Sequence, residues 1–270
     1  MMYTSKKRSL GHMLKLVFLG NLLIITPVIA QLKECIMQQK KVKENLFASC
    51  TEVSNKEYAY YIFSLKEAND YNMLQTSLID SLQWKLNYSY NEPYVLYYHK
   101  HKAYENYPVV NISYNAAIAY CNWLTKLYND DENRKYKKVQ IRLPTIEEWE
   151  LAAKGKYKNA TYPWEDNSLQ TKKGEMRANF KRGNEEIVGA KANINENTDI
   201  IAPVNSYWPN SYGLYNMAGN VAEMTSTANT IKGGSWINNA EELQITGNQT
   251  YDGSPKSYVG FRCFMEVIEK

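Results

Sequence analysis

The sequence predicts one globular domain in which helices are followed by a long stretch of irregular loop. The chain has 270 residues and 44% hydrophobic content, which is enough to bury a core. Capping residues mark three helix starts before Gly155, and beyond it short segments are broken by Gly, Asn, Pro and Asp. No internal repeat or low-complexity linker divides the chain, so a single domain is the simplest organisation.

The first thirty residues are typical of a secretory signal peptide. A basic start is followed by an apolar run and by small residues before a predicted cut after Ala30. Asn21 and Pro27 interrupt the run, which is shorter than the roughly 20 apolar residues that a membrane span needs. We therefore expect residues 1–30 to be removed, which leaves a periplasmic or cell-surface chain with no membrane span.

The leader also accounts for the formal charge. It carries four basic residues and no acid, so the formal charge of +4 falls to zero once it is removed. A neutral chain has no broad attraction for phosphate backbones or anionic lipids. Nucleic acid is therefore not an expected partner.

Four cysteines remain after residue 30, and an even number in an exported chain favours disulfides. None of them forms a CxxC motif, so zinc is not indicated. Cys35 follows the residues LKE rather than small residues, which argues against lipid attachment. The four are Cys35, Cys50, Cys121 and Cys263.

The first helix start follows a polar, Lys-rich lead-in over residues 31–49. Ser54 and Glu57 have the spacing of a capping box, in which a hydroxyl and a carboxylate each accept from the other residue's backbone N–H. The pattern predicts a helix with Tyr58 and Ile62 on one face. The domain proper is expected to cover residues 50–270.

Two further helices have equally clear starts. Thr145 and Glu148 repeat the capping box, and Gly155 is suited to a left-handed turn at the end of that helix. The other begins near Ser113, and its apolar spacing points Cys121 toward the core.

The capped segments and later motifs together resemble, in order, the formylglycine-generating (sulfatase-modifying factor) family. This resemblance implies an α+β fold, an elaborated C-type-lectin-like domain with much irregular loop. It covers about residues 50–265. The matching stretches are TEVSNKEY (51–58), YPVVNISYNAAIAYCNWL (107–124), IRLPTIEEWELAAKG (141–155), YPW (162–164), APVNSYWPNSYGLYNMAGNVAEMTS (202–226), GGSW (233–236) and GFRC (260–263).

A narrower resemblance lies in residues 91–114, NEPYVLYYHKHKAYENYPVVNISY. This stretch is similar to the gliding-motility and type IX secretion lipoproteins built on the same fold. It implies protein partners in a cell-envelope assembly. The chain departs from that group because it lacks a lipidation cysteine.

The family resemblance implies a calcium site in the loop that ends at Glu223. Its ligands would be the side chains of Asn216 and Glu223 and the carbonyls of Gly219 and Val221, all hard oxygen donors. The alternative is a hydrogen-bonded loop without an ion, because one carboxylate gives little charge compensation.

A second family calcium site would map onto Asn179, the carbonyl of Phe180 and Asp199, with Glu196 as the alternative acid. The competing interpretation is an ordinary solvated acidic loop.

The same resemblance implies that the family's chemistry is missing. Active members carry two cysteines, five residues apart, that bind copper(I), and thiolates suit both that metal and the substrate thiol. The family's spacing places these positions at Leu243 and Asn248, and no cysteine lies between Trp236 and Arg262. We therefore expect a pseudoenzyme without catalytic residues and without copper.

Family members with cysteines at the two matching places join them, which implies a disulfide between Cys121 and Cys263. Cys35 and Cys50 form a weaker second pair.

Two other features leave function open. His99 and His101 would share a face on a strand, but two ligands are too few for a defined metal site. The many aromatic residues would also suit a glycan groove, although most aromatics are core. Besides a non-catalytic module, the alternatives are an enzyme of this fold with a relocated or different active site, and a lectin-like glycan-binding module.

Overall fold

The computed structural model describes residues 39–87, 92–181 and 201–270, which belong to one compact unit that begins at Gln39. The predicted signal peptide and Cys35 lie outside the described residues. Two four-stranded sheets, in the orders β1-β2-β8-β3 and β6-β5-β4-β7, form the scaffold. Within this part of the chain no helix is long and apolar enough to cross a membrane.

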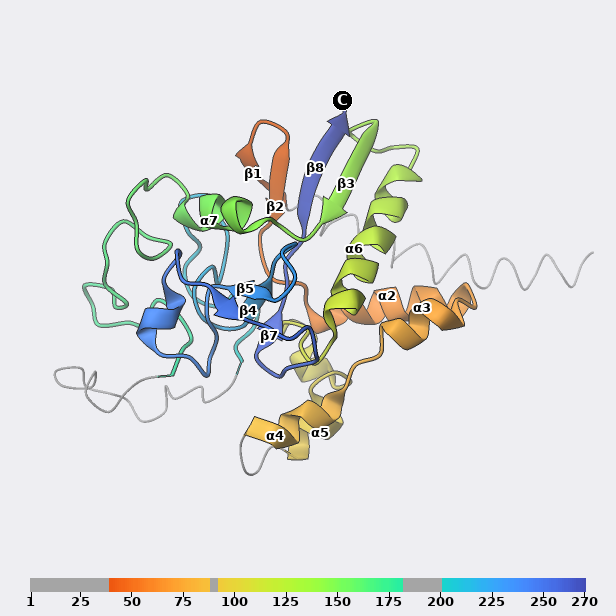
Figure 1. The fold of residues 1–270 in the computed structure, drawn as a ribbon, viewed down its shortest axis with the longest axis horizontal. Coiled ribbons are helices and arrows are strands. Elements are labelled where there is room, and N and C mark those ends of the chain that lie inside the picture. The colour runs from red at the N-terminus through yellow and green to blue at the C-terminus, as the bar shows by residue number, and fades with distance from the viewer. Residues whose placement is uncertain (1–38, 88–91, 182–200) are drawn as a thin grey trace, which may run out of the picture. The chain divides into compact units, whose positions relative to one another are not determined.

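The first sheet joins the two ends of the unit (Figure 1). Its strands are β1 (Gln39–Lys43), β2 (Leu46–Ser49), β3 (Lys138–Arg142) and β8 (Phe264–Glu269), and all neighbours are antiparallel. Residues 39–49, expected as a lead-in, are therefore two strands of the sheet. They fold this way because Val42, Leu46 and Ala48 turn into the core, while the lysines of β1 stay at the surface.

The predicted capped helices are confirmed. Helix α2 (Asn55–Glu67) begins at the Ser54 capping box and α7 (Ile146–Lys154) at the Thr145 capping box. Helix α6 (Tyr114–Asn129) starts after Ser113, and Cys121 is 1% exposed on its inner side. Gly155 ends α7 with a left-handed φ of 57°.

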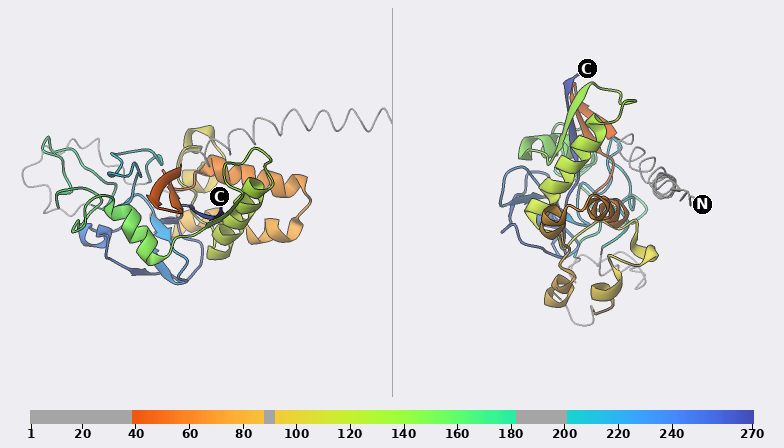
Figure 2. Two further views of the ribbon diagram at one scale, coloured as in Figure 1. Left: turned by 90° about the horizontal axis from the view of Figure 1, so that it is seen from above. Right: turned by 90° about the vertical axis from the view of Figure 1, so that its right-hand side faces the viewer.

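Helix α6 lies alongside β3, and α2 lies beside α3 (Tyr71–Thr76) (Figures 1 and 2). The hydroxyl of Thr125 in α6 donates to the carbonyl of Ile141 in β3 at 2.9 Å. The described residues between α3 and α6 form the short helices η1 (Ser81–Gln83), α4 (Trp84–Asn87), α5 (Glu92–Tyr97) and η2 (Lys102–Tyr104).

The second sheet is small, and long loops lead into it. Its strands are β4 (Ala222–Met224), β5 (Thr230–Lys232), β6 (Gln249–Thr250) and β7 (Val259–Gly260), with the short helix η4 (Ala240–Leu243) between β5 and β6. Residues 155–181 and 201–221 contain no helix or named strand. The α+β class and the extensive irregular loop predicted from the sequence are confirmed.

Candidate functional site

Three residues of the loop predicted to bind calcium adopt left-handed backbone conformations, which let the chain turn tightly. Asn216, Gly219 and Asn220 have φ values of 51°, 74° and 63°. A Cβ at Gly219 would lie 2.3 Å from the carbonyl oxygen of Asn179, so only glycine fits there. The amide of Asn220 donates to that same carbonyl at 2.8 Å. The structure therefore places Asn179, predicted for the second calcium site, against the loop predicted for the first.

Glu223, the one carboxylate of this loop, is paired in the interior. Arg262 donates to both of its oxygens at 2.5 to 2.9 Å, and Nε1 of Trp149 donates to Oε2 at 2.7 Å. Glu223 is 1% exposed and Arg262 is 0% exposed. Removing either partner would leave a buried charge without its counterion, which is far more costly than losing a surface pair.

A second buried carboxylate, Glu52, lies beside the same loop. Its oxygens accept from Nδ2 of Asn220 at 2.8 Å and from Nδ2 of Asn216 at 3.2 Å. Burial raises the pKa of Glu52 to about 8, an effect that Arg262 opposes and Glu223 reinforces. Glu52, Glu223 and Arg262 therefore form a charged centre inside the domain, in which Arg262 is ion-paired with Glu223 and Glu52 is bound by the Asn216 and Asn220 amides.

The oxygen atoms of this loop are the type of ligand that calcium prefers, but they carry little net negative charge to balance the ion. Nδ2 of Asn216 donates to Glu52 and to the carbonyl of Val204, and its Oδ1, the predicted ligand, is used in neither bond. Glu223, however, shares its charge with Arg262, so a cation there would lie near a buried positive group. Calcium at this loop stays a prediction, and the geometry favours weak binding.

The second predicted calcium site is only partly visible. Asn179 and Phe180 are buried, whereas Asp199 and Glu196 lie outside the described residues. Among the residues that are described, no three His, Cys, Asp or Glu side chains are grouped so as to hold a metal.

The two positions predicted to match the family's copper ligands have other roles. Leu243 is 0% exposed and packs in an apolar cluster. Oδ1 of Asn248 accepts from Nζ of Lys232 at 2.9 Å, and Lys232 also donates to Glu150 at 2.9 Å. Burial lowers the pKa of Lys232, and Glu150 opposes this shift. The region therefore combines apolar packing with a buried ammonium group that lies over the ring of Trp149.

The predicted disulfide partners lie next to each other. The Sγ atoms of Cys121 and Cys263 are 3.7 Å apart, and both residues are buried. The bond itself stays a prediction. Cys50 is also buried, and burial raises the pKa of its thiol.

The two histidines do not converge. Nδ1 of His99 lies 2.9 Å from Oδ1 of Asn55, and burial lowers the pKa of His99 to about 3. His101 is exposed, and its ring accepts from the backbone of Ala103. No strand forms here, so the alternation that would place both rings on one face does not arise.

Sequence reasoning missed the charged centre of the domain. Glu52 and Arg262 both lie in motifs that match the family, but they are 210 positions apart and nothing local pairs them. Lys232 was missed too, although it directly precedes GGSW.

The fold and this centre define an irregular α+β domain whose long loops are held by buried ion pairs. Residues 16–267 match the family described as sulfatase-modifying factor enzyme 1-like domain. The chain belongs to this family, which confirms the resemblance found in the sequence.

Relatives include both active and inactive proteins. The formylglycine-generating enzyme of Thermomonospora curvata is 34% identical over 193 residues, which cover 60% of this chain and 57% of the relative. The inactive C-alpha-formylglycine-generating enzyme 2 of Bos taurus is 32% identical over 174 residues, covering 58% of this chain and 50% of the relative. The chain thus spans about half the length of these relatives.

Two solved structures share the fold. Treponema denticola variable protein 1 has a TM-score of 0.53 at 20% identity, covering 82% of this chain and 84% of that one. The structure titled CarF has a TM-score of 0.52 at 20% identity, covering 83% and 87%.

Proposed function

We propose that this protein is an exported, non-catalytic member of the family that serves as a structural or interaction component of a cell-envelope assembly. One observation carries the non-catalytic part: no cysteine occurs between Trp236 and Arg262. Neither an apolar side chain nor a carboxamide replaces a thiolate as a ligand for copper(I).

The packing around the two substituted positions supports this proposal. Leu243 contributes to a buried apolar cluster, so truncating it to cysteine would leave a cavity. Asn248 helps to satisfy the buried ammonium group of Lys232. Both side chains therefore stabilise the packing of this region. An inactive relative shows that the family also contains non-catalytic members.

An activity assay tests the non-catalytic proposal. The purified protein is incubated with copper(I), oxygen and a sulfatase-type cysteine peptide, and mass spectrometry follows conversion of the thiol to the aldehyde. We expect no conversion above a copper-only control, while an active relative run in parallel supplies the positive result. Turnover above the control overturns the proposal.

The envelope role rests on the narrower resemblance of residues 91–114 to gliding-motility and type IX secretion proteins. A tagged copy purified from envelopes of the native host should retain components of such an assembly. An unrelated exported protein with the same tag is the control. Recovery of the same components by both proteins, or of none by either, removes the support for this role.

An enzyme with a relocated active site is the competing function. A bound redox metal in the purified protein, detected by metal analysis and EPR, would favour it over the proposal.

A further inference from the structure

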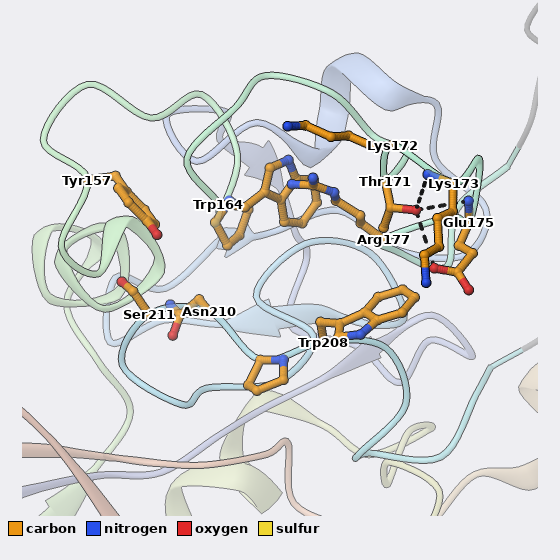
Figure 3. Close-up of a pocket in the computed structure, with 12 residues that line it drawn as sticks. Tyr157, Trp164, Thr171, Lys172, Lys173, Glu175, Arg177, Trp208, Asn210 and Ser211 are labelled. Carbon is orange, nitrogen blue, oxygen red and sulfur yellow. Dashed lines mark hydrogen bonds between the residues drawn. The ribbon is translucent and has the colours of Figure 1, made fainter.

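A cavity of about 520 Å³ lies among the irregular loops, and none of Glu52, Glu223 and Arg262 lines it (Figure 3). This volume falls in the range of small-molecule sites, about 300–1,000 Å³. Three segments distant in sequence line it: residues 157–164, 171–177 and 208–211. None of these lining residues belongs to the predicted calcium or copper positions.

One wall of the cavity is built from side chains that contact one another. Trp164 stacks on Tyr162 with ring centres 5.6 Å apart and an interplanar angle of 15°. The guanidinium of Arg177 lies 5.5 Å from the ring of Trp164 and donates to Asp166 at 2.9 Å. Stacking and an ion pair therefore fix an indole and a cation before any ligand arrives, which lowers the cost of ordering them on binding.

The opposite side presents Trp208, which is 54% exposed (Figure 3). Its segment is held by Asn210, whose side chain donates to the carbonyls of Ala152 and Ala153 and accepts from two backbone amides. A large exposed indole on a fixed segment offers a flat apolar surface to a ligand.

The third side supplies positive charge. A tight turn places Lys172 and Lys173 at the cavity, because the side chain of Thr171 accepts from two backbone amides and Gly174 adopts a φ of 83°. Within the described part of the chain neither ammonium group is paired with a carboxylate. With Arg177 these lysines give three positive groups in the lining, against the single carboxylate of Glu175.

We propose that this cavity binds an acidic saccharide, such as a segment of a uronic-acid polysaccharide. The C–H face of a pyranose ring matches the flat indole of Trp208, and its carboxylate matches the ammonium groups of Lys172 and Lys173. An acidic peptide would lack one source of affinity here, because it could not add to a strand edge: none of the lining segments forms a named strand. The site is separate from the proposed envelope role and stands if that role fails.

Calorimetry with the full chain tests this binding. A tetrasaccharide of galacturonic acid is compared with neutral cellotetraose at low and high salt. We expect the acidic sugar to bind at least tenfold more tightly at low salt and to lose that advantage at high salt. Trp208→Ala should weaken binding of the acidic sugar at least tenfold, and Lys172→Gln with Lys173→Gln should abolish the preference for acid.

Matched surface variants control for general effects. Tyr71→Ala removes another exposed aromatic ring, and Lys66→Gln with Lys102→Gln removes two other exposed lysines. These changes should leave binding unchanged, and melting temperatures confirm that all variants fold. The proposal is overturned if the acidic sugar does not bind, if Trp208→Ala binds it as well as the parent does, or if tetraglutamate binds more tightly and displaces it.

Discussion

Two arginines of this domain each pair with a carboxylate near a tryptophan, but one pair is buried and the other is partly exposed to solvent. Arg262 pairs with Glu223 beside Trp149, and both charged side chains are at most 1% exposed. Arg177 lies over Trp164 and pairs with Asp166, whose side chain is 51% exposed. The first arrangement is sealed in the protein, whereas the second forms part of an open cavity.

The difference separates charge that holds the fold from charge that is available to a ligand. In the interior, the guanidinium of Arg262 also donates to the carbonyls of Ser49, Cys50 and Tyr215, so it ties together segments far apart in the chain. At the cavity, Lys172 and Lys173 line the same pocket as Arg177, and neither pairs with a carboxylate among the described residues. We therefore expect substitutions in the centre to change stability and substitutions at the cavity to change binding.

The largest effect on stability that we expect in the interior comes from a disulfide bond. A bond between Cys121 and Cys263 would close a loop of more than 140 residues, which in the chain-entropy model stabilises by about 4 to 5 kcal/mol, less any strain. Protein from an oxidising compartment should be 2 Da lighter, about two hydrogen masses, than its reduced form and should melt at a higher temperature. Two free thiols at these positions under such conditions would show that the centre depends on packing and ion pairs alone.

The second-largest effect on stability should come from breaking the ion pair between Arg262 and Glu223. Arg262→Met should destabilise by about 3 to 5 kcal/mol, because Glu223 stays buried without its counterion. Arg177→Met is the matched control and should cost about 0 to 1 kcal/mol, since its carboxylate partner is solvated. Denaturant unfolding measures both. Equal losses would remove the distinction between the two sites.

A smaller effect should depend on pH. The pKa of Glu52 is about 8 in the fold against an ordinary 4.5, so the folded state holds a proton that the unfolded chain has released. Stability therefore falls as pH rises toward 8, by at most about 1.4 kcal/mol per pH unit. His99 acts oppositely, but only below its ordinary pKa of 6.5, so the window from pH 6.5 to 8 reports Glu52.

Thermal melts at several pH values test this dependence. Glu52→Gln should flatten the decline between pH 6.5 and 8, and Glu67→Gln, at an exposed position, should leave it intact. A decline that persists in Glu52→Gln would assign the effect to another group.

Calcium should have the smallest effect. A ligand at a hundred times its Kd stabilises by about 2.7 kcal/mol, and the charge that Glu223 shares with Arg262 predicts less here. Millimolar calcium should raise the melting temperature slightly relative to EDTA, and Glu223→Gln should abolish the difference. An identical melt in EDTA would mean that the centre is complete without an ion.

Local chemistry made much of the fold predictable. The capping boxes at Ser54 and Thr145 and the helix start at Ser113 are read from residues within four positions of one another, and all three are present. The strands β1 and β2 were missed because the lysines of β1 are typical of a solvated tail, and β2, only four residues long, is recognised as a strand by its pairing with β1 and β8.

The sequence by itself determined the family, the three helices, the irregular loops and the absence of a cysteine pair near GGSW, because these depend on residue identity and short spacing. Only the tertiary structure decided that Glu52 meets Asn220 and Glu223 meets Arg262, that Lys232 lies next to Asn248, and that Trp164 and Trp208 line one cavity. These contacts join segments tens to hundreds of residues apart. They form because buried charge must find a counterion and loops must pack, and no local pattern records which distant partner meets that need.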